Sequence, residues 1–274
     1  MSVVWRSFLQ MLRLIRRDRM LLAAGAAPLL AGVALRCGVP AAEEVLVRCT
    51  GTALSPYYGL FDILLASLTP AMFCFIAAMV MLEERDDHID RYLFATACGR
   101  NGYYVSRIVL PALAAFSVTA LLLPVFHLSA LLAGAVLCLS LTGALQGVIV
   151  ALLVVALSAN KLEGMAVTKL SSLIILGALV PWFVPAPLCF GLSFLPSFWM
   201  GKAMLESRLT YFLPSFAAAV GWIAALWRRI QRGCRFLDRK SDLENSKIPI
   251  DPDAASSCIL CPCLNKRKHK EVLR

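Results

Sequence analysis

The sequence predicts an all-α polytopic membrane protein with six transmembrane helices, and two observations carry this prediction. Of its 274 residues, 59% are apolar and 16% are charged, whereas soluble domains are about 45–50% apolar and about 25% charged. From Ile108 to Asn160 there is no Asp, Glu, Lys or Arg, a stretch much longer than the roughly 20 residues that cross a bilayer once. This composition excludes soluble, disordered and disulfide-stapled classes of protein.

Uncharged apolar runs place the six spans, taken in chain order, at about residues 20–38, 58–82, 108–126, 128–157, 170–184 and 209–227. A helix rises about 1.5 Å per residue through a hydrocarbon core about 30 Å thick, so the charge-free stretch must cross twice. We expect its turn near Pro124 and Ser129. Between spans five and six, residues 185–208 contain several prolines, which break helices, and we expect a re-entrant segment there.

The distribution of basic residues predicts the topology. With six crossings and a cytoplasmic N-terminus, all but four of the 27 Lys and Arg fall on the inside. The four outside are Arg36, Arg48, Lys202 and Arg208. Because basic residues remain on the cytoplasmic side, we expect a multi-pass protein of the cell (inner) membrane with both termini cytoplasmic. The same rule explains the net charge of +10, so we expect no nucleic-acid partner.

The two ends of the chain differ from this six-span domain, which covers residues 20–230. In residues 1–19, Trp5, Phe8, Leu12 and Ile15 share one helical face, and Arg6, Gln10, Arg13 and Arg17 mark the opposite one. This pattern predicts a helix lying in the interface of the bilayer, although a signal peptide is the alternative. Residues 231–274 are polar and basic, and we expect a disordered cytoplasmic tail.

Motifs for catalysis or nucleotide binding are missing from the sequence. The pair Gly201–Lys202 lacks the upstream glycine and the Ser or Thr of a phosphate-binding loop. We therefore expect neither enzymatic activity nor a cofactor in this chain. Three cysteines of the tail, Cys258, Cys261 and Cys263, could bind zinc with His269. Structural zinc motifs usually have two separated pairs of ligands, so reduced thiols or acylation sites are the favoured explanation, and we predict no metal site.

The most informative segment follows the second span. The apolar run stops at Leu82 and is followed by the charged residues Glu83, Glu84, Asp86, Asp87 and Arg91. We expect residues 83–91 to form a short cytoplasmic helix with exposed charges, held at the membrane by Tyr103 and Tyr104. Such a helix can dock into a soluble partner and pass its motion to the adjoining spans. The alternative is an ordinary solvated loop.

Within the spans, Asp62 is the residue most in need of an explanation. A carboxylate inside a span costs about 2.5–3.5 kcal/mol on insertion scales. Because Asp62 lies near the outer end of span two, it is either hydrated from outside or makes a substrate or structural contact at the outer mouth. Gly143 and Gly147 of span four suit close packing of helices.

The segment after span two resembles the permease subunits of type-2 ATP-binding-cassette (ABC) exporters, most closely the fluoroquinolone-exporter-like permeases. The motif positions are filled by Glu83–Glu84, Tyr92–Leu93, Ala95–Thr96 and Tyr104–Arg107, with Ala97 where the family often has proline. Residues 158–170 and 195–204 resemble two later regions of these permeases, and the likeness spans about residues 5–229.

This resemblance implies two six-span permease subunits, identical or different, that move a drug, peptide or lipid-like substrate out of the cytoplasm. Two separate ABC ATPase subunits would bind the ATP. Residues 83–91 would be the coupling helix, with Glu83, Glu84, Asp86, Asp87 and Arg91 facing the ATPase. The alternative functions are a secondary transporter or a membrane scaffold without an ATPase. An enzyme acting on lipids is disfavoured because the acidic cluster lacks the spacing of a magnesium–diphosphate site.

Overall fold

The computed structural model describes residues 3–51, 53–95, 99–171, 173–185 and 188–247, and within them it contains helices but no strands. It divides into two units, residues 1–230 and 231–274, which are described separately. The elements are α1 (Val3–Arg17), α2 (Arg19–Thr50), η1 (Ser55–Tyr57), α3 (Tyr58–Asp86), α4 (Ile89–Ala95), α5 (Gly99–Tyr104), η2 (Val105–Val109), α6 (Leu110–Phe126), α7 (Ala133–Leu157), α8 (Lys161–Ser171), α9 (Leu173–Leu176), η3 (Gly177–Leu179), α10 (Val180–Phe183), η4 (Leu188–Leu192), α11 (Pro196–Leu205), η5 (Leu209–Tyr211) and α12 (Phe212–Lys247). The all-α prediction is confirmed.

Six helical segments are long and apolar enough to cross a membrane, which confirms the predicted number. They are Arg19–Thr50, Ser55–Asp86, Asn101–Phe126, Ala133–Leu157, Lys161–Phe183 and Leu209–Gln231. The first differs most from its prediction, because α2 continues past Arg36 and ends only where Gly51 adopts a left-handed φ of 70°. Its 32 residues extend over about 48 Å, at about 1.5 Å per residue. The hydrocarbon core is only about 30 Å thick, so the charged C-terminal end of α2 extends beyond it.

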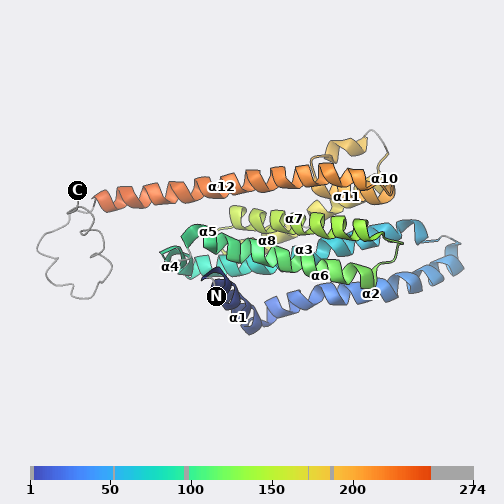
Figure 1. The fold of residues 1–274 in the computed structure, drawn as a ribbon, viewed down its shortest axis with the longest axis horizontal. Helices are drawn as coiled ribbons and strands as arrows, with labels where there is room; N and C mark the ends of the chain where they lie inside the picture. Colours follow the sequence, from blue (N-terminus) through green and yellow to red (C-terminus); the bar gives the residue numbers. More distant parts are fainter. Residues whose placement is uncertain (1–2, 52, 96–98, 172, 186–187, 248–274) are drawn as a thin grey trace, which may run out of the picture. The chain divides into compact units, whose positions relative to one another are not determined.

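Helices α3 and α7 form the centre of residues 1–230 and run side by side (Figure 1). Of their apolar stretches, 67% and 72% are buried, against 17% for α2. A Cβ atom added at Gly143 would lie 2.3 Å from the carbonyl oxygen of Ala66, and one at Gly147 would lie 2.7 Å from that of Pro70. Only glycine allows two backbones to approach so closely, which confirms the expected packing role of these two residues.

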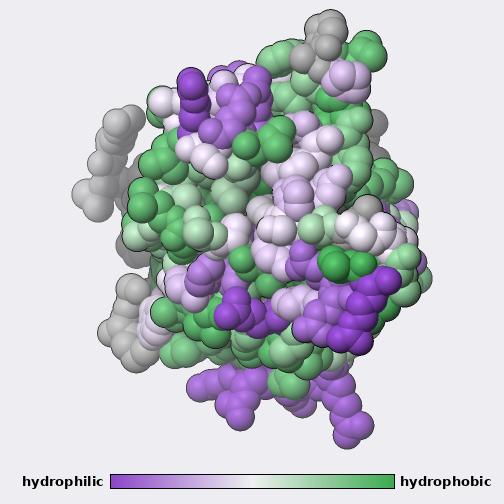
Figure 2. Space-filling view, turned by 90° about the vertical axis from the view of Figure 1, so that its right-hand side faces the viewer, coloured by the Kyte–Doolittle hydropathy of each residue, from purple (hydrophilic) through white to green (hydrophobic). Residues whose placement is uncertain are grey.

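The outer faces of the bundle carry large exposed apolar side chains. Leu30 of α2, Leu121 of α6 and Leu213 of α12 are 69%, 72% and 71% exposed. Figure 2 looks onto the right-hand end of Figure 1 and shows hydrophobic side chains over much of the surface, with hydrophilic ones in several separate groups among them. Apolar flanks of this kind on a soluble protein would aggregate, and they are the expected surface of a multi-pass membrane protein.

Between the fifth and sixth spans the chain doubles back. After α10 it returns far enough for the indole nitrogen of Trp222, in α12, to donate a hydrogen bond to the carbonyl of Phe194 at 3.0 Å. Helix α11 then runs back beside η3, where a Cβ atom at Gly201 would lie 2.3 Å from the carbonyl oxygen of Ala178. This hairpin has the shape expected of a re-entrant segment, and its depth in the bilayer stays a prediction.

An apolar cavity of about 260 Å³ opens beside this hairpin. Its walls come from α7, from the junction of α8 and α9, from the turn before α11 and from α12. The two polar groups on this wall are already used, because Trp222 binds Phe194 and the hydroxyl of Ser171 donates to the carbonyl of Thr168. The surface of the cavity is therefore apolar, since the polar groups of Trp222 and Ser171 already make hydrogen bonds within the protein.

The second unit begins within α12, which continues as a helix to Lys247. The sequence led us to expect a disordered tail from residue 231, so residues 231–247 differ from that expectation. Cys258, Cys261 and Cys263 lie outside the described residues.

Candidate functional site

Three ion pairs between different helices lie at one end of the bundle. There α1, the last turns of α3 and α7, helix α5 with η2, and the start of α8 come together. We call this region the α1 end. It contains most of the charged residues that the sequence singled out.

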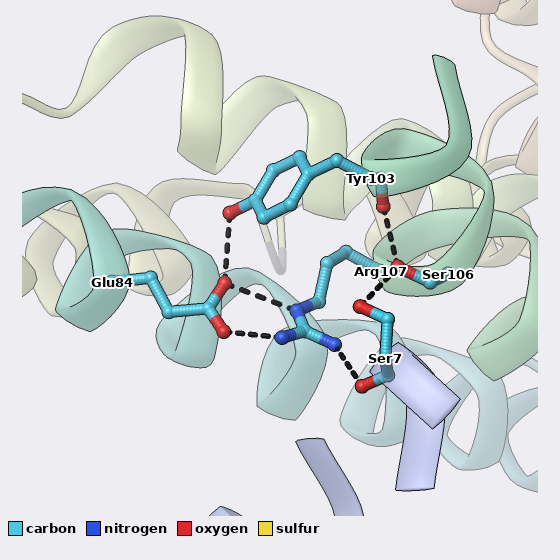
Figure 3. A network of polar contacts seen from close by, with 5 residues as sticks. All are labelled: Ser7, Glu84, Tyr103, Ser106 and Arg107. Atoms are coloured by element: carbon cyan, nitrogen blue, oxygen red, sulfur yellow. Dashed lines mark hydrogen bonds and ion pairs between the residues drawn. The ribbon is translucent and has the colours of Figure 1, made fainter. Parts of the chain in front are cut away.

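A fully buried ion pair between Glu84 and Arg107 lies at the heart of the α1 end (Figure 3). Glu84 is 2% exposed and Arg107 is 0% exposed. The Nε atom of Arg107 donates to Oε2 of Glu84 at 3.0 Å, and its Nη2 atom donates to Oε1. This two-pronged geometry compensates both groups for the loss of water better than a single contact would.

The remaining hydrogen-bonding capacity of the pair joins it to two further elements (Figure 3). The hydroxyl of Tyr103 donates to Glu84 at 2.9 Å, and Nη1 of Arg107 donates to the carbonyl of Ser7 in α1 at 2.7 Å. The hydroxyl of Ser106 donates to the Tyr103 carbonyl at 2.8 Å and lies 3.2 Å from that of Ser7. The network thus ties α1 and the start of the third span to the end of α3.

The backbone around Arg107 departs from regular α-helix. Residues Val105–Val109 form η2, a turn of π-helix between α5 and α6. Such wide turns occur mostly as single turns within helices and are frequent at functional sites. Here the π-turn carries the arginine that pairs with α3.

A second, partly exposed set of contacts centres on Lys161 at the start of α8. Its ammonium group lies 3.0 Å from a carboxylate oxygen of Glu83 and 3.4 Å from one of Asp18. Its backbone amide donates to Asp86 at 3.0 Å. Exposed ion pairs contribute little stability, so the significance of this set is that it joins α8 to α3 and to the junction of α1 and α2.

The end of α7 is fixed to α3 by Arg85. Its Nη1 atom donates to the carbonyls of Val155 and Ser158 at 3.3 and 3.0 Å. The last carbonyls of a helix lack partners within the helix and carry partial negative charge, so a guanidinium group there is favourable.

Asp18 forms the break between α1 and α2. It has extended backbone angles, and its carboxylate accepts hydrogen bonds from the amides of Met20 at 2.9 Å and Leu21 at 3.4 Å, capping α2. The hydrogen bond from the Met20 amide is the largest influence on the pKa of Asp18 and lowers it, assisted by Leu21 and Lys161 and opposed by partial desolvation. The ionised cap is therefore the favoured form.

The short helix α4 projects from the end of α3. The two are separated by a turn in which His88 takes a positive φ of 58°. Phe94 packs edge-on against Tyr103 with ring centroids 5.2 Å apart, whereas Tyr92 is 75% exposed and Ile89 is 38% exposed. Helix α4 is thus held on one side by aromatic rings and presents apolar and aromatic side chains on another.

The charged groups of the α1 end serve mainly as contacts between helices. In the described part of the chain, no group of three or more His, Cys, Asp and Glu side chains could hold a metal ion. The charged groups at its centre are paired with each other and with the backbone. Their arrangement joins the ends of several helices through a few directional contacts.

Comparison with protein families identifies the chain. The family model described as "Fluoroquinolones export permease protein Rv2686c-like" matches residues 11–228. The chain belongs to this family. No curated protein matches it.

In this permease, the predicted coupling residues do not share one surface. Nothing breaks α3 at Leu82, so Glu83–Asp86 form its last turn, and the separate short helix is α4. Because adjacent residues on a helix point about 100° apart, Glu83 is partly exposed while Glu84 is buried. The expectation that Glu84 is an exposed charge is therefore wrong.

The other predicted coupling residues divide between contact and exposure. Asp86 is exposed and caps α8, and Asp87 is exposed at the end of α3. Arg91 lies on α4, and its side chain is outside the described part of the structure. Their contact with an ATPase stays a prediction.

Asp62 lies at the opposite end of the permease from the ion pair. It is 1% exposed, so the expectation of a carboxylate hydrated from outside is wrong. Its two oxygens accept hydrogen bonds from the amides of Leu128 at 2.8 Å and Ser129 at 2.9 Å, and the Ser129 hydroxyl also donates to it. Asp62 therefore fastens the loop between α6 and α7 to α3, which is the structural contact among the alternatives.

Sequence reasoning did not single out Arg107 as a site residue. It entered only as a basic residue at the start of span three. A usable signal was its spacing: Tyr103 and Arg107 stand four residues apart and so share one helical face, which here points at Glu84.

Proposed function

We propose that this permease is the membrane subunit of an ATP-driven exporter and that a separate ABC ATPase binds at the α1 end, on the cytoplasmic side. ATP would be bound by that partner, since the sequence has no phosphate-binding loop of its own. The observation that carries the proposal is α4, a short helix that follows the end of the central helix α3 and exposes Ile89 and Tyr92. The protein belongs to a family of export permeases, which supports transport out of the cell.

Helix α4 has the surface of a docking element. Tyr92 and Ile89 supply exposed apolar contact area, and aromatic side chains are common anchors at protein interfaces. Asp87, exposed beside them, adds charge that would fix orientation more than affinity. Glu83, Asp86 and Arg91 would border this contact.

A force on α4 would reach several spans at once. Glu84 and Arg107 connect the end of α3 to the third span and to α1, and Lys161 connects it to α8 at the start of the fifth span. Rigid-body rotation of such linked helices is a known way to convert closure of a partner into opening of a path. Alternating access in this permease would use that linkage.

The proposed assembly contains a second permease subunit, identical or related. In the first, fifth and sixth spans, only 17%, 18% and 22% of the apolar stretches are buried, which leaves surface for both lipid and a second subunit. The substrate would be an amphipathic drug such as a fluoroquinolone, as the family description suggests. The apolar cavity of about 260 Å³ beside α12 suits the ring system of such a molecule.

Co-purification from mild detergent tests the proposal. The tagged permease should retain a nucleotide-binding ATPase when both are produced together. Changing Tyr92→Ala with Asp87→Lys should release it, because both side chains are exposed on the proposed docking surface. Leu132→Ala is the matched control, since Leu132 is 72% exposed, close to the 75% of Tyr92, but directly precedes α7 at the opposite end.

The outcomes separate the candidate functions. If no ATPase is retained by the unaltered protein, the secondary transporter or scaffold becomes the better account. If the ATPase stays bound to the Tyr92 and Asp87 variant, the exporter function stands and the docking site lies elsewhere.

A further inference from the structure

Helix α1 presents three different faces around its axis. Ser7 and Met11, one turn apart, are buried against the bundle at 8% and 2% exposure. Trp5 and Leu12, two turns apart, form a second face and remain 43% and 38% exposed. Packing against the protein therefore accounts for only part of the apolar surface of this helix.

The third face and the junction with α2 carry unpaired positive charge. The arginines concerned are Arg6, Arg13, Arg16, Arg17 and Arg19, all of them exposed. Within the described residues, none of these five guanidinium groups has a hydrogen-bond acceptor or an acidic partner. The nearby carboxylate of Asp18 is engaged by the amides that it caps and by Lys161. The positive charges of such a cluster repel one another, so binding of an external anion would stabilise it.

The exposed apolar face of α1 continues into the membrane-facing surface of α2. Met20 and Leu22, directly after the arginines, are 57% and 52% exposed. Arg16, Arg17 and Arg19 thus lie where the first span begins, which in a bilayer is the level of the lipid headgroups. The anion that fits this position best is an amphiphilic one, because its apolar tail can cover Trp5, Leu12 and Met20.

We propose that α1 binds anionic phospholipid headgroups through these arginines, with acyl chains against its apolar face. Guanidinium groups bind phosphate in a two-pronged geometry, and clusters of four to eight basic residues beside a span are typical of anionic-lipid binding. Because Ser7 accepts from Arg107, bound lipid would also hold α1 against the ion pair. This inference does not depend on the identity of the ATPase or of the transported substrate.

Lipid binding to the full-length protein in mild detergent tests the proposal. Phosphatidylglycerol and phosphatidylcholine with the same acyl chains would be titrated separately, and retained lipid would be counted by native mass spectrometry. Phosphatidylglycerol should bind in preference. Arg13→Gln with Arg17→Gln should weaken it by about fivefold for each arginine removed at low ionic strength, with an unchanged unfolding midpoint.

The control variant is Arg48→Gln with Arg208→Gln. It removes the same charge from two exposed arginines at the opposite end and should leave phosphatidylglycerol binding unchanged. The proposal is overturned if the two lipids bind equally, or if the control weakens binding as much as the α1 variant. It is also overturned if inorganic phosphate or a short oligonucleotide binds α1 with the same dependence on Arg13 and Arg17 and displaces the lipid.

Discussion

Replacing Arg107 by methionine should destabilise this permease by about 3–5 kcal/mol, the usual effect of removing one partner of a buried ion pair. The change would leave the carboxylate of Glu84, at 2% exposure, with Tyr103 as its remaining donor. Glu84→Leu should have a similar effect for the converse reason. Arg107 would then keep only the Ser7 carbonyl among the acceptors seen in the structure.

The double variant Glu84→Leu with Arg107→Met separates stability from function. Replacing both charges by apolar side chains of similar size is often neutral or stabilising by about 1–4 kcal/mol, so much of the lost stability should return. Transport should not return, because the tie from α3 to α1 is still missing. In stability, each single variant should lose what the double variant largely regains, so the coupling free energy between the two substitutions should be large and favourable.

Two assays read out these variants. Urea unfolding of the detergent-purified protein, followed by circular dichroism, gives stability, and drug accumulation in cells gives transport. Single variants as stable as the unaltered protein would refute the buried pair. A double variant as unstable as the sum of the two singles would refute the view that the pair interacts chiefly with itself.

Three further substitutions probe the packing, the α1–α2 junction and the opposite end. Gly143→Ala should destabilise the permease by about 1–3 kcal/mol, because the added Cβ atom would lie 2.3 Å from the backbone of α3. Gly221→Ala is the control and should be neutral or stabilising, because a Cβ atom there would meet nothing within 4 Å. The unfolding midpoints of the two variants test this difference. Because the pKa of Asp18 is lowered in the folded state, its contribution is present above its unfolded pKa of about 3.9 and is lost as pH falls through the lower folded value; Asp18→Asn should flatten the stability profile in that acid range, and an unchanged profile would contradict this. Asp62→Ala should leave two loop amides without their acceptor and lower stability by about 1–3 kcal/mol, measured by the same unfolding assay, and a neutral effect would argue against its fastening role.

The six spans could be predicted because membrane insertion imposes a long uncharged run that composition alone reveals. Where the limits were wrong, the cause was the assumption that a helix ends where its apolar run ends. Helix α2 passes through Arg36, and even through Pro40, and α3 passes through Glu83. Charged residues are good or tolerable helix formers, so a charge alone does not end a helix.

The structure places the predicted coupling residues at the end of α3 and on α4, but it buries Glu84, which was expected to be exposed. Adjacent acidic residues suggested a solvated cluster, yet a helix sends Glu83 and Glu84 in different directions. Glu84 is the one that meets Tyr103 and Arg107, which lie about 20 residues further along the chain. Contacts between residues so far apart in the chain are set by the tertiary packing of the bundle, which local patterns do not contain.

The central claim is that ATP hydrolysed by a partner drives export, and transport into inverted membrane vesicles tests it most directly. Vesicles containing the permease and its ATPase should accumulate a fluoroquinolone when ATP is added, and a protonophore should not stop this. The double change Tyr92→Ala with Asp87→Lys should abolish the accumulation, and Leu132→Ala should not. Accumulation that needs a proton gradient and proceeds without ATP would contradict the account and identify a secondary transporter.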